Sequence, residues 1–163
     1  MTSRLLVDKI EGKASTNNII FPAGMVIQTV EAFRLPYTAT SSTSFVSTSL
    51  ECVITPKFST SKVLINLNIN GCSRDNDADY LVWHIYKNGS NHHSVATNHS
   101  QNADGRSASL SHQYLDSPST TSAVTYTVYY RSGTGAGQVG YNNYGIGGAD
   151  TTRSTIILQE ISG

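Results

Sequence analysis

The stretch that decides the fold is FVSTSLECVITPKFSTSKVLINLNIN, residues 45–70. Its second half places Val63, Ile65, Leu67 and Ile69 on one face and Asn66, Asn68 and Asn70 on the other. A period of two residues is typical of a β-strand with one buried and one solvated face. The first half is rich in β-branched residues and residues 56–61 have turn composition, so the stretch predicts an antiparallel hairpin. A hairpin needs a second sheet over its apolar face, which predicts a β-sandwich.

The overall composition favours short strands and polar loops. Ser, Thr and Asn make up about a third of the 163 residues, and only 13% of the residues are charged. This balance does not suit amphipathic helices. A chain of this length has room for one domain with a hydrophobic core and for an additional arm. We therefore expect an all-β protein with almost no helix.

Charge and hydropathy argue against several classes of partner. The 11 Lys and Arg residues balance the 11 Asp and Glu residues, and the chain has no basic run of the kind that neutralises phosphates. Asp8, Lys9 and Glu11 stand where a signal peptide needs an uninterrupted apolar run. No window approaches the apolar length of a membrane span. We expect a protein that is made as a soluble intracellular product, does not bind nucleic acid and does not insert into a membrane.

Residues 1–23 differ from the rest and are predicted to be an N-terminal attachment arm, with residues 24–163 forming the sandwich domain. The arm contains two apolar patches that are too short to bury themselves. Two interpretations stay open: a frayed terminus that adds some strand to the domain, or an arm that docks on a neighbouring subunit or a larger particle. The candidate partner-binding residues are Leu5, Leu6, Val7, Ile10, Ile19, Ile20 and Phe21.

Further strands are expected at regular spacing along the chain. They are predicted at residues 25–35, 80–87, 92–98, 108–115, 123–131 and 153–161. Asn88-Gly89 is a strong hairpin signal, whereas residues 36–44 predict a loop. Residues 132–148 hold seven of the 13 glycines and predict a long loop interrupted by at most a short strand. About eight strands without intervening helices predict an antiparallel two-sheet sandwich of jelly-roll type.

The two cysteines of the chain are Cys52 and Cys72. In the predicted hairpin they lie several residues apart along the sheet, beyond the distance that a disulfide bridges. Cytoplasmic synthesis also argues against a disulfide. We therefore expect both cysteines to be unpaired and buried, because free cysteine is among the most buried residue types.

The predicted strand at residues 80–87 carries apolar bulk on both faces. Leu81, Trp83 and Ile85 form one face, and the other face is formed by Tyr80, Val82, His84 and Tyr86. A strand with two apolar faces belongs in the middle of a sheet. We expect its second face to meet another subunit, which makes Tyr80, Val82, His84 and Tyr86 the predicted oligomer interface.

An acidic segment, Asp75-Asn-Asp-Ala-Asp79, resembles the start of a calcium loop. A helix-loop-helix site would need Gly where Tyr80 stands and Glu where Tyr86 stands, so the motif fails. We interpret the segment as a solvated loop, with a cation held in an irregular loop as the alternative.

No catalytic or zinc constellation emerges from the histidines. They are His84, His92, His93, His99 and His112, and they lack Cys partners and the helical spacing of a zinc motif. His84 and His92 are expected to face each other across the Asn88-Gly89 turn. Nucleophile-elbow, phosphate-loop and dinucleotide motifs are also absent from the sequence. We therefore expect a non-enzymatic protein without a metal or cofactor.

The glycine-rich segment contains a candidate receptor loop formed by Tyr141, Asn142, Asn143 and Tyr144. An aromatic ring can stack on a sugar while Asn side chains bind its hydroxyl groups, and jelly rolls can carry such sites. This loop keeps a lectin-like carbohydrate-binding module open as an alternative function, with a cell-surface glycan as its ligand.

Five segments carry a family resemblance: residues 3–10 (SRLLVDKI), 22–30 (PAGMVIQTV), 45–70, 83–89 (WHIYKNG) and 153–161 (RSTIILQEI). Together they resemble small virion proteins of tailed bacteriophages, particularly phages of cyanobacteria and other aquatic bacteria. The resemblance implies a β-sandwich module, commonly a homotrimer, whose N-terminal segment attaches to other virion proteins. This chain lacks the extended shaft repeats of long fibres. The expected functions are therefore a short tail fibre that contacts the host surface or tail partners and, as the alternative, a capsid decoration protein that stabilises the head.

Overall fold

The computed structural model describes residues 22–98, 108–142 and 152–163 of the chain. All the regular secondary structure in these ranges is β-strand, as the composition predicts. The strands are β1 (Val26–Arg34), β2 (Thr38–Thr40), β3 (Val46–Ile54), β4 (Lys62–Arg74), β5 (Leu81–Lys87), β6 (Ser90–Asn98), β7 (Ala108–Asp116), β8 (Val124–Ser132), β9 (Val139–Tyr141) and β10 (Ser154–Ile161). The short strand β2 lies in a segment that the sequence predicts to be a loop.

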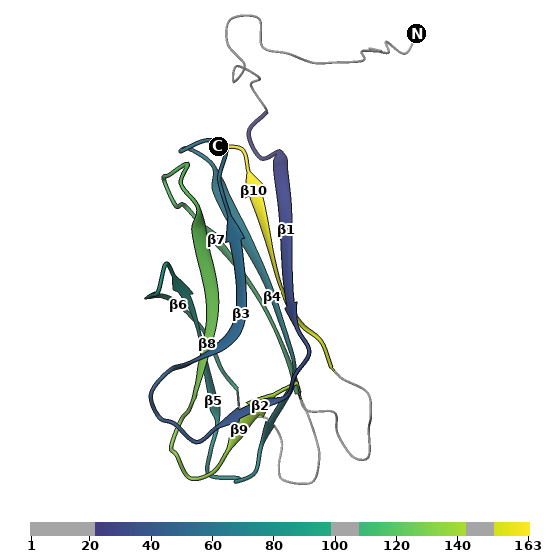
Figure 1. Ribbon diagram of the computed structural model, residues 1–163, viewed down its shortest axis with the longest axis vertical. Helices are drawn as coiled ribbons and strands as arrows, with labels where there is room; N and C mark the ends of the chain where they lie inside the picture. Colours follow the sequence, from purple (N-terminus) through teal and green to yellow (C-terminus); the bar gives the residue numbers. More distant parts are fainter. Residues whose placement is uncertain (1–21, 99–107, 143–151) are drawn as a thin grey trace, which may run out of the picture.

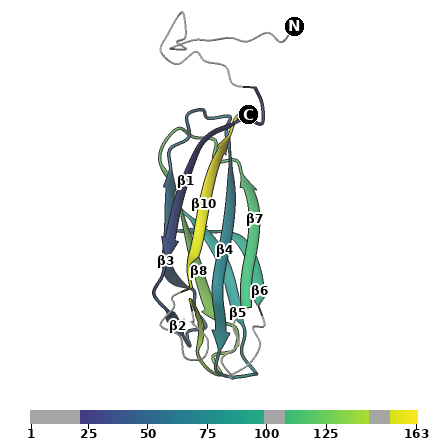
Figure 2. The same cartoon turned by 90° about the vertical axis from the view of Figure 1, so that its right-hand side faces the viewer.

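The strands form two antiparallel sheets that pack face to face (Figures 1 and 2). The four-stranded sheet has the order β3-β8-β5-β6. In the six-stranded sheet, β10 lies between β1 and β4, and β7 also pairs with β4. The C-terminal end of β4 pairs with β9, which in turn pairs with β2. The predicted two-sheet sandwich is therefore confirmed.

The connections between the long strands cross repeatedly from one sheet to the other. β3 and β4, β4 and β5, β6 and β7, and β7 and β8 lie in opposite sheets, whereas β5 and β6 are neighbours in one sheet. With β2 and β9 set aside, each layer holds four long strands. This path of the chain is the jelly-roll arrangement.

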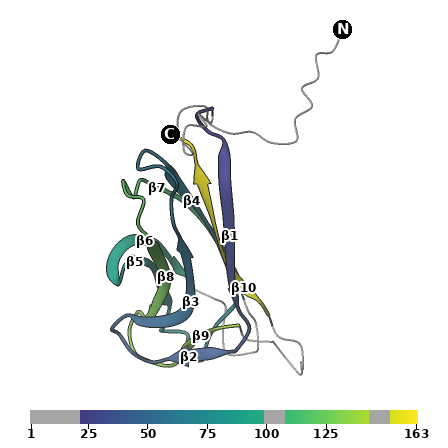
Figure 3. The same ribbon diagram turned by 45° about the horizontal axis from the view of Figure 1, so that its top comes forward.

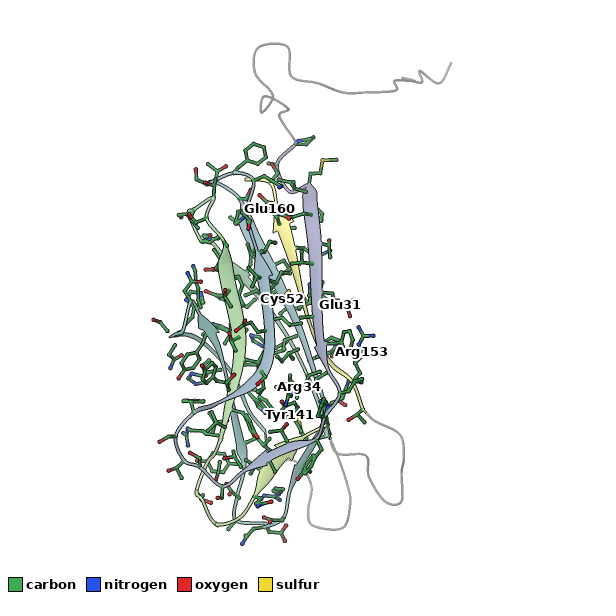
Figure 4. All side chains as sticks on the ribbon, viewed as in Figure 1. Glu31, Arg34, Cys52, Tyr141, Arg153 and Glu160 are labelled. Carbon is green, nitrogen blue, oxygen red and sulfur yellow. The ribbon has the colours of Figure 1, made fainter. Side chains whose placement is uncertain are left out.

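The hairpin predicted for residues 45–70 is wrong. β3 pairs with β8, whereas β4 pairs with β10 and β7 in the opposite sheet. The segment between β3 and β4 crosses one end of the sandwich, where the amides of Lys57 and Phe58 donate to the buried carboxylate of Glu160, at 2.7 and 3.3 Å. Figure 4 places Glu160 near the end of the sandwich at which β1 begins. The alternation of apolar and polar residues correctly indicated one buried face for each strand. Two strands with such faces can be neighbours in one sheet, but they can also lie in opposite sheets with their apolar faces in contact.

The core between the sheets is filled by aliphatic and aromatic side chains from both layers. Trp83 and Tyr130 stack with ring centroids 5.2 Å apart, and Tyr141 meets both rings edge-on at 5.8 and 5.3 Å. All three side chains are fully buried. Cys52 and Cys72 are also buried and do not form a disulfide, as predicted, and they lie on strands of opposite sheets.

The hairpin at Asn88-Gly89 is confirmed. Asn88 and Gly89 have φ angles of 50° and 78°, and positive values at both positions match the type I′ turn that suits two twisted strands. The register beyond the turn differs from the prediction, because β6 shifts its pairing with β5 at two places. His84 pairs with Ser94, so the expected pair of His84 and His92 is wrong.

Candidate interaction surface

The outward side of the four-stranded sheet carries a cluster of aromatic side chains. Trp83 and Ile85 of β5 are fully buried against the other sheet, so His84 and Tyr86 project from the opposite side of the strand. On the neighbouring strand β8, Tyr129 is the register partner of His84. The two central strands therefore present their aromatic side chains on the same face.

Four rings contact one another here, and we call this set, Phe45, His84, Tyr86 and Tyr129, the outer aromatic surface. Tyr86 and Tyr129 stack with centroids 3.9 Å apart and 21° between the ring planes. The ring of Phe45 lies 4.3 Å from His84 and 6.1 Å from Tyr86. All four side chains are partly exposed in the single chain, so part of their apolar area stays in contact with solvent.

Polar and charged side chains surround these rings. The guanidinium of Arg131 lies 5.4 Å from the centroid of the Phe45 ring. Nδ1 of His84 lies 2.9 Å from Oδ1 of Asn91, and Thr127 donates a hydrogen bond of 2.9 Å to Glu51. An aromatic centre with Arg and a polar rim has the composition of many protein–protein interfaces.

The structure brings together only part of the predicted oligomer interface. His84 and Tyr86 lie in the outer aromatic surface, but Val82 is only 8% exposed. Tyr80 precedes β5 and packs on Gly133, where an added Cβ atom would lie 2.2 Å from the Tyr80 ring.

Two members of the outer aromatic surface were not among the predicted interface residues. Tyr129 could have been found from the alternation of its strand, which places it on the face of Thr125 and Thr127. Phe45 directly precedes β3. Its position against His84 depends on the crossing path of the chain, for which the sequence carries no signal.

The expectation of an exposed receptor loop is wrong for Tyr141 and Asn142, which are both fully buried. Tyr141 lies in β9, and β9 with β2 closes one end of the sandwich (Figure 3). Asn142 donates to the carbonyls of Arg34 and Pro36 at 3.0 and 3.3 Å and accepts a hydrogen bond of 2.6 Å from Ser154. Asn143 and Tyr144 lie outside the described residues, as do His99 and all the arm residues proposed to bind a partner.

The acidic segment at residues 75–79 ends in a carboxylate that anchors the glycine-rich loop. Asp79 is fully buried and accepts hydrogen bonds from the Ser132 hydroxyl at 2.6 and 2.8 Å and from the amide of Tyr80 at 2.8 Å. The amides of Gly133 and Thr134 each donate to it at 3.1 Å. The carboxylate is thus surrounded by donors of the protein itself.

The protonation of Asp79 follows from these contacts. Burial by itself would raise the pKa of this carboxyl group, but hydrogen bonds from Ser132 and from backbone amides outweigh it and lower the pKa to about 2. Among the described residues, no group of three or more His, Cys, Asp or Glu side chains is arranged to hold a metal ion. The hydrogen bonds from Ser132, Gly133 and Thr134 to its carboxylate give Asp79 a structural role in orienting the loop.

Comparisons with known proteins add no family assignment. No protein-family model matches the chain, and no curated protein matches it. Within residues 22–98, 108–142 and 152–163, no helix is long and apolar enough to span a membrane.

Proposed function

We propose that the chain is a non-enzymatic structural protein of a tailed-phage virion and that it assembles into a homotrimer through the outer aromatic surface. The sequence resemblance supports the virion role and the trimer. The observation that carries the choice of interface is the partly exposed cluster of Phe45, His84, Tyr86 and Tyr129. Burial of such rings between subunits removes apolar area from water, and aromatic residues with Arg often dominate binding energy.

The outward side of the six-stranded sheet mixes polar side chains with exposed apolar ones such as Leu115, which is 47% exposed. Its exposed Gln113 donates a hydrogen bond of 2.7 Å to Asn66, and amides of this kind are already well solvated. Phe33 is 55% exposed, but the guanidinium of Arg153 lies 4.0 Å from its ring centroid and also pairs with Glu31. In Figure 4, Glu31 and Arg153 are labelled on this side of the molecule. The two outer faces therefore differ in the chemistry that they offer a second copy.

Net charge is compatible with self-association. The chain has a formal net charge of zero at neutral pH, so no long-range repulsion opposes the approach of identical copies. Light scattering of the purified protein tests the oligomer directly. We expect a mass three times the 17.6 kDa of one chain, whereas a monomer at micromolar concentration would contradict the proposal.

The position on the particle separates two forms of this proposal. A glycine- and tyrosine-rich loop that meets a variable partner would favour the short tail fibre, but Tyr141 and Asn142 are buried, and Asn143 and Tyr144 lie outside the described residues. A capsid decoration protein that stabilises the head is therefore an equal alternative. Immunogold labelling of intact virions distinguishes the two: label confined to the tail identifies a fibre, and label over the head identifies a decoration protein. Particles without label would contradict a virion role.

A further inference from the structure

The two sheets approach each other at the edge formed by β6 and β7, and side chains make this contact. β6 pairs with β5 and β7 pairs with β4, so no backbone ladder joins β6 to β7 in the described ranges. Nε2 of His93 on β6 lies 3.0 Å from Nε2 of His112 on β7. Nε2 of His92 lies 3.2 Å from Oδ1 of Asp116 on β7. We call these four residues the β6–β7 contact.

An irregularity in β6 makes this contact available to two successive histidines. Tyr86 pairs with Asn91 and Ile85 pairs with His93, so His92 is an extra residue between two ladder pairs. Successive side chains of a regular strand point to opposite faces, whereas a bulge re-aims one of them. Both histidines thereby reach Tyr114 of β7, whose ring centroid lies 5.7 Å from that of His92 and 3.8 Å from that of His93.

The bond between His93 and His112 exists in only some protonation states. A hydrogen bond between two ring nitrogens needs one N–H donor and one lone pair, so at least one imidazole must be neutral. If both rings are protonated, each nitrogen is a donor and two positive charges stand about one hydrogen-bond length apart. Burial lowers the pKa of His93, and the nearby His112, His92 and His84 lower it further.

Other charged and titratable groups pack around the pair from each neighbouring strand. From β5, Nζ of Lys87 lies 2.7 Å from Oδ2 of Asp116, while His84, on the outward face of the sheet, acts on His93 through its charge. From β8, the hydroxyl of Tyr126 donates to the same carboxylate oxygen at 2.6 Å. On β7 itself, Tyr114 stacks on His93. Asp116 is therefore shared by Lys87 and His92, and its carboxylate lies against His92 rather than against His93 or His112.

We propose that the His93–His112 pair makes the β6–β7 contact acid-sensitive, so that it is closed at neutral pH and separates when both imidazoles become protonated. The pH dependence of the free energy of unfolding follows from the difference in proton binding between the folded and unfolded chains. Because the pKa of His93 is lowered in the folded protein, the unfolded chain binds a proton at this position more readily, and folding stability decreases as the pH falls below about 6.5. Most carboxylates titrate well below this range, which leaves the histidines as the groups that respond. The proposal does not depend on the virion role.

Thermal unfolding at fixed protein concentration, followed between pH 7.5 and pH 5.5, tests this proposal. The wild-type protein should lose about 3 °C or more in its unfolding midpoint over this interval. In the His112→Gln variant the loss should be less than half as large, because a Gln carbonyl accepts a hydrogen bond from a protonated His93. The matched control is His92→Gln, which makes the same change at the residue next to His93. Its unfolding midpoint should fall between pH 7.5 and pH 5.5 by nearly as much as that of the wild-type protein.

A second measurement covers the case in which His112→Gln does not fold. An NMR titration of the wild-type protein should show His93 protonating below the ordinary histidine pKa of about 6.5, with resonances of β6 and β7 shifting in the same step. Equal losses of unfolding midpoint in wild type and His112→Gln would overturn the proposal. Protonation of His93 at the ordinary histidine pKa, with no shift of the β6 and β7 resonances, would overturn it as well.

Discussion

The hydroxyl group of Tyr141 donates a hydrogen bond of 2.6 Å to the backbone carbonyl of Thr48, which ties β9 of the six-stranded sheet to β3 of the four-stranded sheet. The Thr48 hydroxyl itself donates to the carbonyl of Val128 at 2.7 Å. The same Tyr141 ring packs edge-on against Trp83 and Tyr130. One side chain thus joins both layers by an apolar and a polar contact.

Substitutions at Tyr141 should separate these two contributions. Tyr141→Phe removes only the hydrogen bond and should lower the free energy of unfolding by about 1 kcal/mol. Tyr141→Ala also leaves a cavity beside Trp83 and should cost about 4 kcal/mol. Chemical denaturation measures both values. Tyr129→Phe is the control on the outer aromatic surface and should change the free energy by less than about 0.5 kcal/mol. A Tyr141→Ala variant as stable as wild type would show that the ring is not part of the core.

Asp79 should contribute a pH-dependent part of the stability. Because its pKa is lowered from 3.8 to about 2, the contribution is present above pH 4 and is lost as the pH falls toward 2. At neutral pH, Asp79→Asn should lower the free energy of unfolding by about 2 kcal/mol, since amide and hydroxyl donors lose their charged acceptor.

Comparison of Asp79→Asn with wild type at several pH values isolates this group from the other carboxylates. The difference in the free energy of unfolding between the two proteins should shrink between pH 4 and pH 2. A difference that stays constant over this range would contradict the role of Asp79 as a buried anionic acceptor.

The outer aromatic surface predicts how the oligomer should be disrupted. Tyr86→Glu places a charge beside the stacked ring of Tyr129 and should shift the protein from trimer to monomer without loss of strand content. Light scattering and circular dichroism measure the two properties. Gln113→Glu makes a similar change in charge on the outer side of the other sheet and should leave the trimer intact. If Tyr86→Glu also stays trimeric, the interface lies elsewhere.

The attachment role of the N-terminal arm is tested by removing residues 1–21. This truncation keeps the turn at Pro22, whose carbonyl accepts a hydrogen bond of 3.1 Å from Met25, and the bond of 2.8 Å from the amide of Gly24 to Ser162. We expect the domain to remain folded and oligomeric, with unfolding midpoints close to those of the full chain. Incorporation into particles, measured by immunoblot of purified virions, should be lost. Loss of the cooperative unfolding transition would identify the segment as a core element.

Much of the fold follows from local sequence pattern. The alternation of Val63, Ile65, Leu67 and Ile69 records one buried face, and all four side chains are at most 1% exposed. Asn88-Gly89 determines its turn because the type I′ geometry needs positive φ at both positions. Both features depend on residues within a few positions of each other, so a single sequence contains the information that they need.

The tertiary structure alone decided which buried faces meet. A period of two residues shows that β3 and β4 each have an apolar side, but it does not distinguish a neighbouring strand from one in the opposite sheet. The burial of Tyr141, the role of Asp79 and the contact of His93 with His112 all follow from pairings between segments far apart in the chain. Such pairings are determined by the packing of the whole core and by bulges that shift the register, and neither is encoded in the local periodicity of any one strand.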